Sequence, residues 1–376
     1  MRKKILLLFL GILFAFLVGE ILTRIFLPPL QKVVFQPTNF HSRLQQENSH
    51  RSDFSLPSHP SEGGLYVETE TGRRLRANTR VTILNHSVSH RTVEISTNSI
   101  GYRNPEIGVK AGTRILFLGD SITFADYLPE QETFVRLAET IARQHGKNWQ
   151  TINAGVGSVS LKTELAILHE TGLALKPDVV VVCFFLDDFR DAPGVRITPL
   201  PLFLDRSTFA SYLYLFTART LFKSKEETGP DFSAIKIDFL ARHHVSSGYW
   251  RTNPNAFYAM MLVNLEYVGA TWSPITWKFM LPLFEEAKSL AQQNNFKLCI
   301  VAFPIRQQVE TVFDTGDPQK FFKQMTERIN VPALDLLPVF RKAWQSSNEP
   351  IFYDVCHHTP RGSKIVAEEI YKFLSS

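Results

Sequence analysis

The feature that most constrains the fold is an alternation of short apolar runs with amphipathic segments over residues 111–376. The clearest runs are RILFLG at 114–119, VVVVCFF at 179–185 and KLCIVAF at 297–303. Uninterrupted apolar runs of this kind are typical of parallel strands that are covered on both faces. Between the first two strands, residues 134–141 have apolar positions at helical spacing. The pattern predicts an α/β domain with a parallel central sheet.

Two other regions have a different character. Residues 28–60 contain several prolines among polar residues, which predicts a linker, and residues 64–99 alternate polar and apolar positions. We therefore expect residues 28–110 to form a linker and a small antiparallel β element. Residues at about 190–275 are rich in aromatic side chains and lack a strand–helix period, which predicts an insertion or lid within the α/β domain.

The N-terminus has the pattern of a membrane anchor. Arg2, Lys3 and Lys4 precede an apolar run that continues to Leu27 with few interruptions. The unbroken part, to Gly19, gives only ~22 Å of helix, short of the ~30 Å hydrocarbon core, but the full segment is long enough to span it. A cleaved signal peptide is the rival interpretation, and no A-x-A-like site follows the run. We expect residues 1–27 to be an uncleaved transmembrane anchor, with everything after it outside the cytoplasm.

Composition and cysteine content narrow the function classes. The chain has 376 residues, 44% of them hydrophobic and 20% charged, so it can bury a sizeable core. The net charge of +5 is spread without a basic stripe, so no nucleic-acid partner is expected. Cys183 and Cys299 lie in apolar runs, and no CxxC spacing is present. His86 and His90 would lie ~13 Å apart on a strand, too far to share an ion. We expect these histidines on a solvated strand edge, and neither a metal nor a cofactor.

Polar residues follow the apolar runs directly, where ligands of an open parallel sheet bind. Asp120 and Ser121 come after the run at 114–119, and the turn at 155–158 comes at the end of a further expected strand, WQTINAGVG at 149–157. Asp187 and Asp188 follow the run at 179–185, and the stretch FYDVCHHTPRG precedes the last helix. The sequence therefore predicts that a serine, backbone donors, carboxylates and a histidine meet at one edge of the sheet.

These residues suit nucleophilic catalysis. A serine needs a base within hydrogen-bonding distance and a third group that orients the base. We expect Ser121 to be the nucleophile, His357 the base and Asp354 its partner. The backbone N–H groups of Ser121, Gly157 and Ser158 are candidate donors to a developing oxyanion.

Three alternatives stay open for this group of residues. Ser121 could be only the cap of the next helix, because serine is a good N-cap. His358 would be the base if His357 is not, although a packing role is expected for it. Cys356 is expected to be structural, since it follows no strand-to-helix turn.

The segments GDSIT and DVCHHTPRG resemble the SGNH (GDSL-type) hydrolase superfamily, and the likeness extends in order over about residues 112–374. It implies a three-layer, flavodoxin-like fold and a cofactor-free Ser–His–Asp triad. Members are esterases, lipases and acyl- or acetyltransferases. The segment NSIGYRNPEI and the anchor resemble membrane-tethered bacterial members, which implies a single-pass inner-membrane protein whose catalytic domain faces the periplasm or exterior.

One position departs from the family pattern. Asp187 stands where the resemblance implies an asparagine whose amide donates to the oxyanion. An ionised aspartate cannot donate, so it could serve only when protonated. Two hypotheses follow. The first is an anchored esterase or acyltransferase acting on ester-bearing small molecules, lipids or polysaccharides of the envelope. The second is a catalytically weakened binding or scaffold protein with the same fold.

Overall fold

The structure is a computed structural model whose description covers most of two regions, 64–191 and 274–376, together with the N-terminal helix. The described residues are 2–26, 64–191, 207, 209, 210, 213, 249–254, 257, 261, 270–272, 274–347 and 349–376. The chain divides into two compact units, one of residues 1–38 and 196–270 and the other of residues 39–195 and 271–376.

The larger unit is built on a five-stranded sheet in which every neighbouring pair is parallel. The spatial order is β6-β5-β7-β8-β9, which in chain order is 2-1-3-4-5, the flavodoxin-like order. The predicted parallel α/β sheet is therefore confirmed. The strands are β5 (Thr113–Gly119), β6 (Trp149–Asn153), β7 (Val179–Phe185), β8 (Lys297–Phe303) and β9 (Ala333–Asp335).

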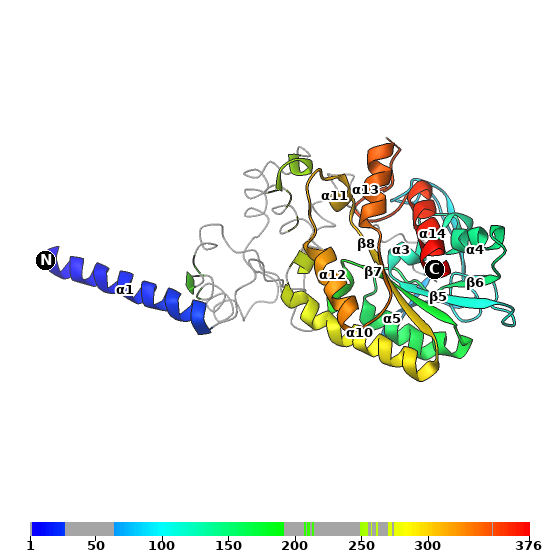
Figure 1. Cartoon of the computed structure of the whole chain (residues 1–376), viewed down its shortest axis with the longest axis horizontal. Coiled ribbons are helices and arrows are strands. Elements are labelled where there is room, and N and C mark those ends of the chain that lie inside the picture. Colours follow the sequence, from blue (N-terminus) through cyan, green and yellow to red (C-terminus); the bar gives the residue numbers. More distant parts are fainter. Residues whose placement is uncertain are drawn as a thin grey trace. The chain divides into compact units, whose positions relative to one another are not determined.

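Helices cover both faces of this sheet, which gives three layers (Figure 1). The helices α4 (Phe134–Gln144), α13 (Leu337–Ser346) and α14 (Pro360–Ser375) pack together on one face. The helices α5 (Leu161–Ile167), α10 (Pro274–Asn294) and α12 (Asp317–Arg328) lie on the other. Burial on both faces explains why β5 reads as a continuous apolar run: its residues 115–118 are at most 1% exposed.

The ends of the helices are set by side-chain hydrogen bonds and by glycine and proline residues, which the sequence shows only in part. The hydroxyl of Thr133 accepts from the backbone N–H of Arg136 at the start of α4, and Gly146 follows its end with φ 74°. The stretch VPALDLLPVF, at 331–340, reads as a strand and a turn; the strand β9 is present, but helix α13 begins at Leu337, where the turn was expected. The Asp335 carboxylate accepts from the Leu337 N–H at 3.0 Å, and Pro338 suits a first helical turn, so the helix α13 begins there.

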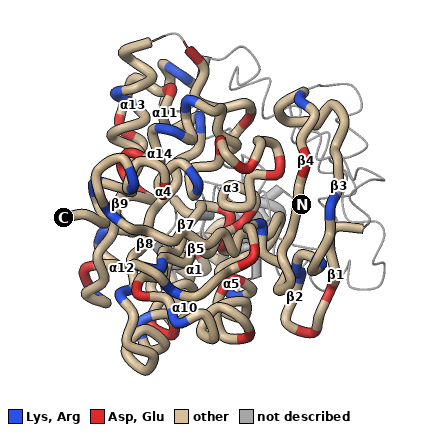
Figure 2. The backbone as a smooth tube through the Cα atoms, turned by 90° about the vertical axis from the view of Figure 1, so that its right-hand side faces the viewer, with Lys and Arg blue, Asp and Glu red and all other residues tan. Residues whose placement is uncertain are grey.

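Two small antiparallel hairpins lie beside the α/β core, in the region where the sequence predicted a β element (Figure 2). The first pairs β1 (Tyr66–Thr69) with β2 (Gly72–Leu75), and the second pairs β3 (Arg80–Ile83) with β4 (Val93–Ser96). Ion pairs join each hairpin to the core: Arg74 with Glu170 at 2.9 Å, and Arg91 with Glu132 at 2.5 Å.

The expectation that both histidines of the second hairpin lie on a solvated edge was wrong for His86. The loop between β3 and β4 folds inward, so His86 is 4% exposed and its Nε2 lies 3.7 Å from Asp126. His90 is exposed and adopts a left-handed backbone conformation with φ 55°.

The smaller unit contains the N-terminal helix α1 (Arg2–Phe26). The Glu20 carboxylate accepts from the Ser207 hydroxyl at 2.7 Å and from the Phe209 N–H at 2.9 Å. The predicted helix is thus present, but none of the helices in the described residues has the length and apolar character needed to cross a membrane. The linker expected at 28–60 and most of the insertion expected at 190–275 lie outside the described residues.

Candidate active site

The candidate nucleophile lies at the sharp turn between β5 and the short helix α3 (Ser121–Phe124). The Asp120 side chain caps this helix, because its Oδ1 accepts from the Ile122 N–H at 2.9 Å. Ser121 is therefore the first helical residue and not the cap, so the capping interpretation of Ser121 was wrong. A Cβ at Gly119 would collide with the side chain of Thr123, which explains why glycine precedes the turn. The half-buried Ser121 hydroxyl is left available for another partner.

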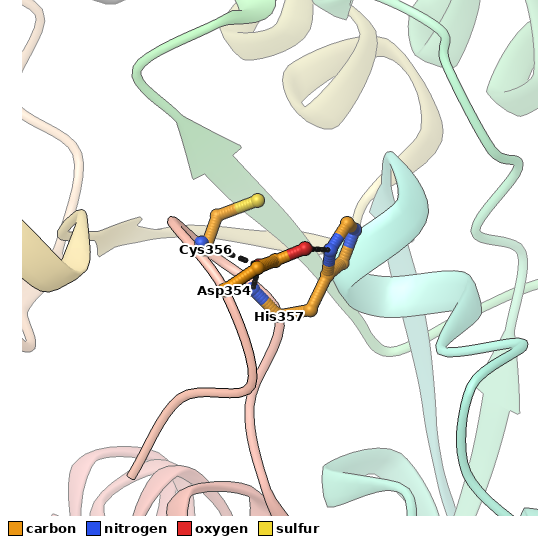
Figure 3. Close-up of side chains that lie close together, drawn as sticks. All are labelled: Asp354, Cys356 and His357. Atoms are coloured by element: carbon orange, nitrogen blue, oxygen red, sulfur yellow. Dashed lines mark hydrogen bonds and ion pairs between the residues drawn. The ribbon is translucent and has the colours of Figure 1, made fainter. Parts of the chain in front are cut away.

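That partner is His357, from the loop before α14. The Ser121 Oγ lies 3.0 Å from His357 Nε2, and His357 Nδ1 lies 2.6 Å from Asp354 Oδ2. A carboxylate only accepts, so Nδ1 carries a proton, and in the neutral imidazole Nε2 accepts from the serine hydroxyl. The second oxygen of Asp354 accepts from the backbone N–H groups of Cys356 and His357, which fixes the loop around the carboxylate (Figure 3). The structure brings the three predicted residues together in the order that nucleophilic catalysis requires.

The pair of His357 and Asp354 has shifted pKa values. Burial raises the pKa of Asp354, but the His357 charge and the hydrogen bonds from His357 and Cys356 outweigh it and lower the pKa to about 2. Burial likewise lowers the pKa of His357, but the Asp354 charge outweighs it and raises the pKa well above its usual value. Asp354 is therefore ionised at neutral pH, and the imidazolium that forms during catalysis is stabilised by it.

The neighbours of His357 have the structural roles expected of them. Cys356 is half-buried with a free thiol, and burial raises the pKa of this thiol to about 12, so it stays protonated. The His358 ring is 1% exposed and packs against Phe303, Phe340 and Phe352. Burial, with the charge of His357, lowers the pKa of His358 to about 3. His358 is therefore a neutral packing residue and not the base.

Tyr127 is a site residue that the sequence did not reveal. Its ring is 1% exposed and its centroid lies 4.8 Å from that of His357. Tyr127 forms a small cluster with Ala125 and Leu128, against which Val88 and Tyr353 pack. The cluster confines one side of the catalytic imidazole. In the sequence, Tyr127 stands out only by its position shortly after the GDS turn.

The turn after β6 packs against α3. The Val156 N–H donates to the Gly119 carbonyl at 3.0 Å, and a Cβ at Gly155 would collide with the Phe124 backbone. The next two residues are Gly157 and Ser158, and neither N–H donates to another residue that the structure describes. A left-handed conformation of Ser158, with φ 60°, ends the turn. These N–H groups and that of Ser121 remain the candidate donors to an oxyanion.

The two aspartates after β7 differ in their surroundings. Asp187 is half-buried, whereas Asp188 is 1% exposed and accepts from the Phe185 N–H at 2.8 Å. Burial, together with the nearby charges of Glu164 and Asp120, raises the pKa of Asp188 well above its usual value. Burial and the charge of Asp120 also raise the pKa of Glu164, which is 0% exposed. Asp188, one position after the residue that the sequence singled out, is thus a buried carboxyl with a raised pKa.

Comparisons with known proteins give matches among solved structures only. No family model and no curated protein matches the chain. An acetyl xylan esterase, AlAXEase, is 15% identical over 69% of this chain and 98% of its own, with a TM-score of 0.39. Axe2, an acetylxylan esterase from Geobacillus stearothermophilus, is 12% identical over 72% of this chain and 97% of its own, with a TM-score of 0.41.

A third similar structure is a putative lipolytic protein of the G-D-S-L family from Desulfitobacterium hafniense. It is 11% identical over 69% of this chain and 99% of its own, with a TM-score of 0.37. The functional assignment of the site rests on the geometry of Ser121, His357 and Asp354.

Proposed function

We propose that the chain is a serine esterase or an acyl- or acetyltransferase of the SGNH type that works through an acyl-enzyme. The observation that carries this proposal is the hydrogen-bonded series Ser121–His357–Asp354, with distances of 3.0 and 2.6 Å. The series lies at the carboxyl edge of a parallel sheet, where substrates of such folds bind.

Each group has a defined task in this reaction. His357 Nε2 takes the proton of Ser121 as Oγ attacks the ester carbonyl, and Asp354 stabilises the imidazolium. Backbone N–H groups of Ser121, Gly157 and Ser158 donate to the oxyanion. His357 then gives its proton to the leaving alcohol as the ester C–O bond breaks. Water or a second alcohol attacks the acyl-enzyme in the same way, which returns Ser121 to its free form.

Hydrolysis of p-nitrophenyl acetate tests this proposal. The purified protein is expected to release p-nitrophenol, and Ser121→Ala is expected to reduce the rate to background. The matched control is Ser289→Ala, a change in α10 away from the carboxyl edge of the sheet, and it is expected to retain the wild-type rate. A Ser121→Ala variant with wild-type activity would contradict the proposal.

We also propose that the N-terminal helix attaches the chain to the inner membrane of a bacterium, with the catalytic domain in the periplasm or exterior and envelope esters as substrates. Three N-terminal basic residues precede the apolar run of α1, and the exposed residues of that helix include Leu13, Phe14, Leu17 and Ile25. Retention of the full chain in the membrane pellet after carbonate extraction would support attachment. Release of the full chain into the soluble fraction would contradict it.

Asp187 favours a second candidate function, a binding or scaffold protein that keeps the fold with a weakened site. An ionised carboxylate at the carboxyl end of β7 cannot donate to an oxyanion. Replacement of Asp187 by asparagine, with kcat measured for both proteins, separates the two candidates.

A further inference from the structure

The helix that carries the nucleophile is too short to be stable without contacts to the rest of the domain. α3 comprises only Ser121–Phe124, and an isolated helix this short is unstable in water. Its last carbonyl groups have no partner within the helix and must find donors elsewhere. Because Ser121 is its first residue, any shift of α3 displaces the nucleophile from His357.

The carbonyl groups at the end of α3 are satisfied by Arg103. Its guanidinium donates to the Phe124 carbonyl at 2.8 Å, to the Ala125 carbonyl, and to the Leu128 carbonyl at 2.6 Å. The side chain is 0% exposed and its guanidinium carbon lies 5.7 Å from the centre of the Phe124 ring. Burial lowers the pKa of Arg103 to about 10, so it stays charged at neutral pH. A cation at the carboxyl end of a helix also stabilises it electrostatically.

The backbone at this end of α3 is strained. Ala125 adopts the left-handed conformation, with φ 51° and ψ 46°, which usually belongs to glycine. Such a residue persists only where its surroundings determine the conformation. Two of the carbonyl groups that Arg103 binds belong to Ala125 itself and to its predecessor. The guanidinium is thus in a position to keep the chain in this conformation.

The segment that carries Arg103 is itself fixed to the core. The Asn98 Oδ1 accepts from the Tyr102 N–H at 2.9 Å, and the Asn104 Oδ1 accepts from the Asn153 N–H at 3.1 Å. The side-chain amide of Asn153 donates to the Thr123 carbonyl at 2.8 Å. Residues 98–104 therefore contact both α3 and the strand β6 beside it.

We propose that Arg103 is a positioning residue, which sets the place of Ser121 relative to His357 by binding the carbonyl groups at the end of α3. The proposal rests on the esterase or acyltransferase function proposed above. Displacements of about 1 Å at a reacting group reduce rates by about 10²-fold. Lysine cannot reproduce the planar, forked donor arrangement of arginine, so Arg103→Lys should allow such a displacement while keeping the charge.

The test compares Arg103→Lys with Arg114→Lys, for kcat and KM on p-nitrophenyl acetate and for the rate of labelling by a fluorophosphonate. Arg114 is also buried and donates to the Leu175 and Gly108 carbonyl groups, but it lies near the opposite end of β5. We expect Arg103→Lys to lower kcat and the labelling rate by about 10²-fold with KM within about twofold. We expect Arg114→Lys to lower the melting temperature similarly and to keep wild-type kcat.

A second variant separates positioning from general stability. Glycine adopts the left-handed conformation without strain, so Ala125→Gly in the Arg103→Lys background should restore at least about tenfold of the lost kcat. Equal kcat in Arg103→Lys and the wild type would overturn the proposal, and so would equal losses of kcat in Arg103→Lys and Arg114→Lys. An Arg103→Lys protein that does not fold, and that Ala125→Gly does not restore, would also overturn it, because Arg103 would then support the whole domain.

Failure of this inference is distinguishable from failure of the proposed function. A wild-type protein that the fluorophosphonate does not label would contradict the proposed function itself. Labelling of the wild type at a rate that Arg103→Lys does not change would contradict only the role of Arg103.

Discussion

The His357 Nε2 lies 3.0 Å from the Ser121 hydroxyl, although 236 positions separate the two residues in the chain. The sheet order brings them together, because β5 is an inner strand and the loop before the last helix passes its carboxyl end. Asp354, on the far side of the imidazole, fixes which ring nitrogen carries the proton.

Replacement of Asp354 by asparagine tests this orientation. An amide can donate to Nδ1 and so favours the wrong tautomer, which reduced activity about 10⁴-fold in the serine-protease triad. We expect a loss of the same order in kcat, with KM little changed. The control is Asp317→Asn, at the first position of α12. A loss of less than about tenfold would show that Asp354 does not orient the base.

The pH dependence of activity follows from the same pair. His357 acts as a base only when neutral, and its pKa lies well above the usual value of about 6.5 because Asp354 outweighs the effect of burial. The value of kcat/KM should therefore rise with pH through an apparent pKa above that of an ordinary histidine. In Asp354→Asn the apparent pKa should fall. A wild-type profile that decreases from pH 6 to pH 9 would contradict this assignment.

Asp187→Asn tests whether the position after β7 limits catalysis. The amide can donate where the carboxylate cannot, and one oxyanion donor is worth about 10²–10³ in kcat. We expect an active wild type and a higher kcat in the variant. A wild-type rate at background together with a large gain would favour the binding or scaffold function. A kcat in the variant equal to that of the wild type would show that the Asp187 carboxylate does not limit catalysis.

Glu164 makes stability depend on pH. Its folded-state pKa is well above the unfolded value of about 4.3, because the side chain is buried and near Asp120. The folded state therefore binds more protons than the unfolded state above that pH, and stability falls as pH rises. Glu164→Gln should reduce this slope, with the remainder due to Asp188, so the variant should melt higher than the wild type at pH 9 but not at pH 5. Glu286→Gln, an exposed change in α10, should leave the slope unaltered.

Much of this fold is predictable from local patterns. The runs at β5, β7 and β8 are apolar because both faces of each strand are covered. A run of this kind can be recognised from consecutive residues alone. The triad was predictable because a GDS turn and a DxxH loop each follow or precede a recognisable element. The turn expected within residues 331–340 was wrong because helix α13 begins with a hydrogen bond from the Leu337 N–H to Asp335, which is a local contact that the apolar pattern does not show.

Other parts of the site depend on tertiary contacts that the sequence does not encode locally. His86 is buried because the loop between β3 and β4 packs near Asp126 and Tyr127, far along the chain. Arg103 and Tyr127 lie outside the strand and helix patterns of the sequence, and their roles arise only when their segments meet α3 and His357. The burial of Asp188 rather than Asp187 likewise depends on the position of α5, which carries Glu164.

Covalent labelling with a fluorophosphonate, followed by peptide mapping, tests most directly whether Ser121 and His357 share a proton. The wild-type protein should carry one label on the peptide that contains Ser121. Ser121→Ala should carry none, and His357→Ala should label at least about 10²-fold more slowly. An unlabelled wild-type protein, or labelling that is unchanged in His357→Ala, would contradict the assignment of these two residues.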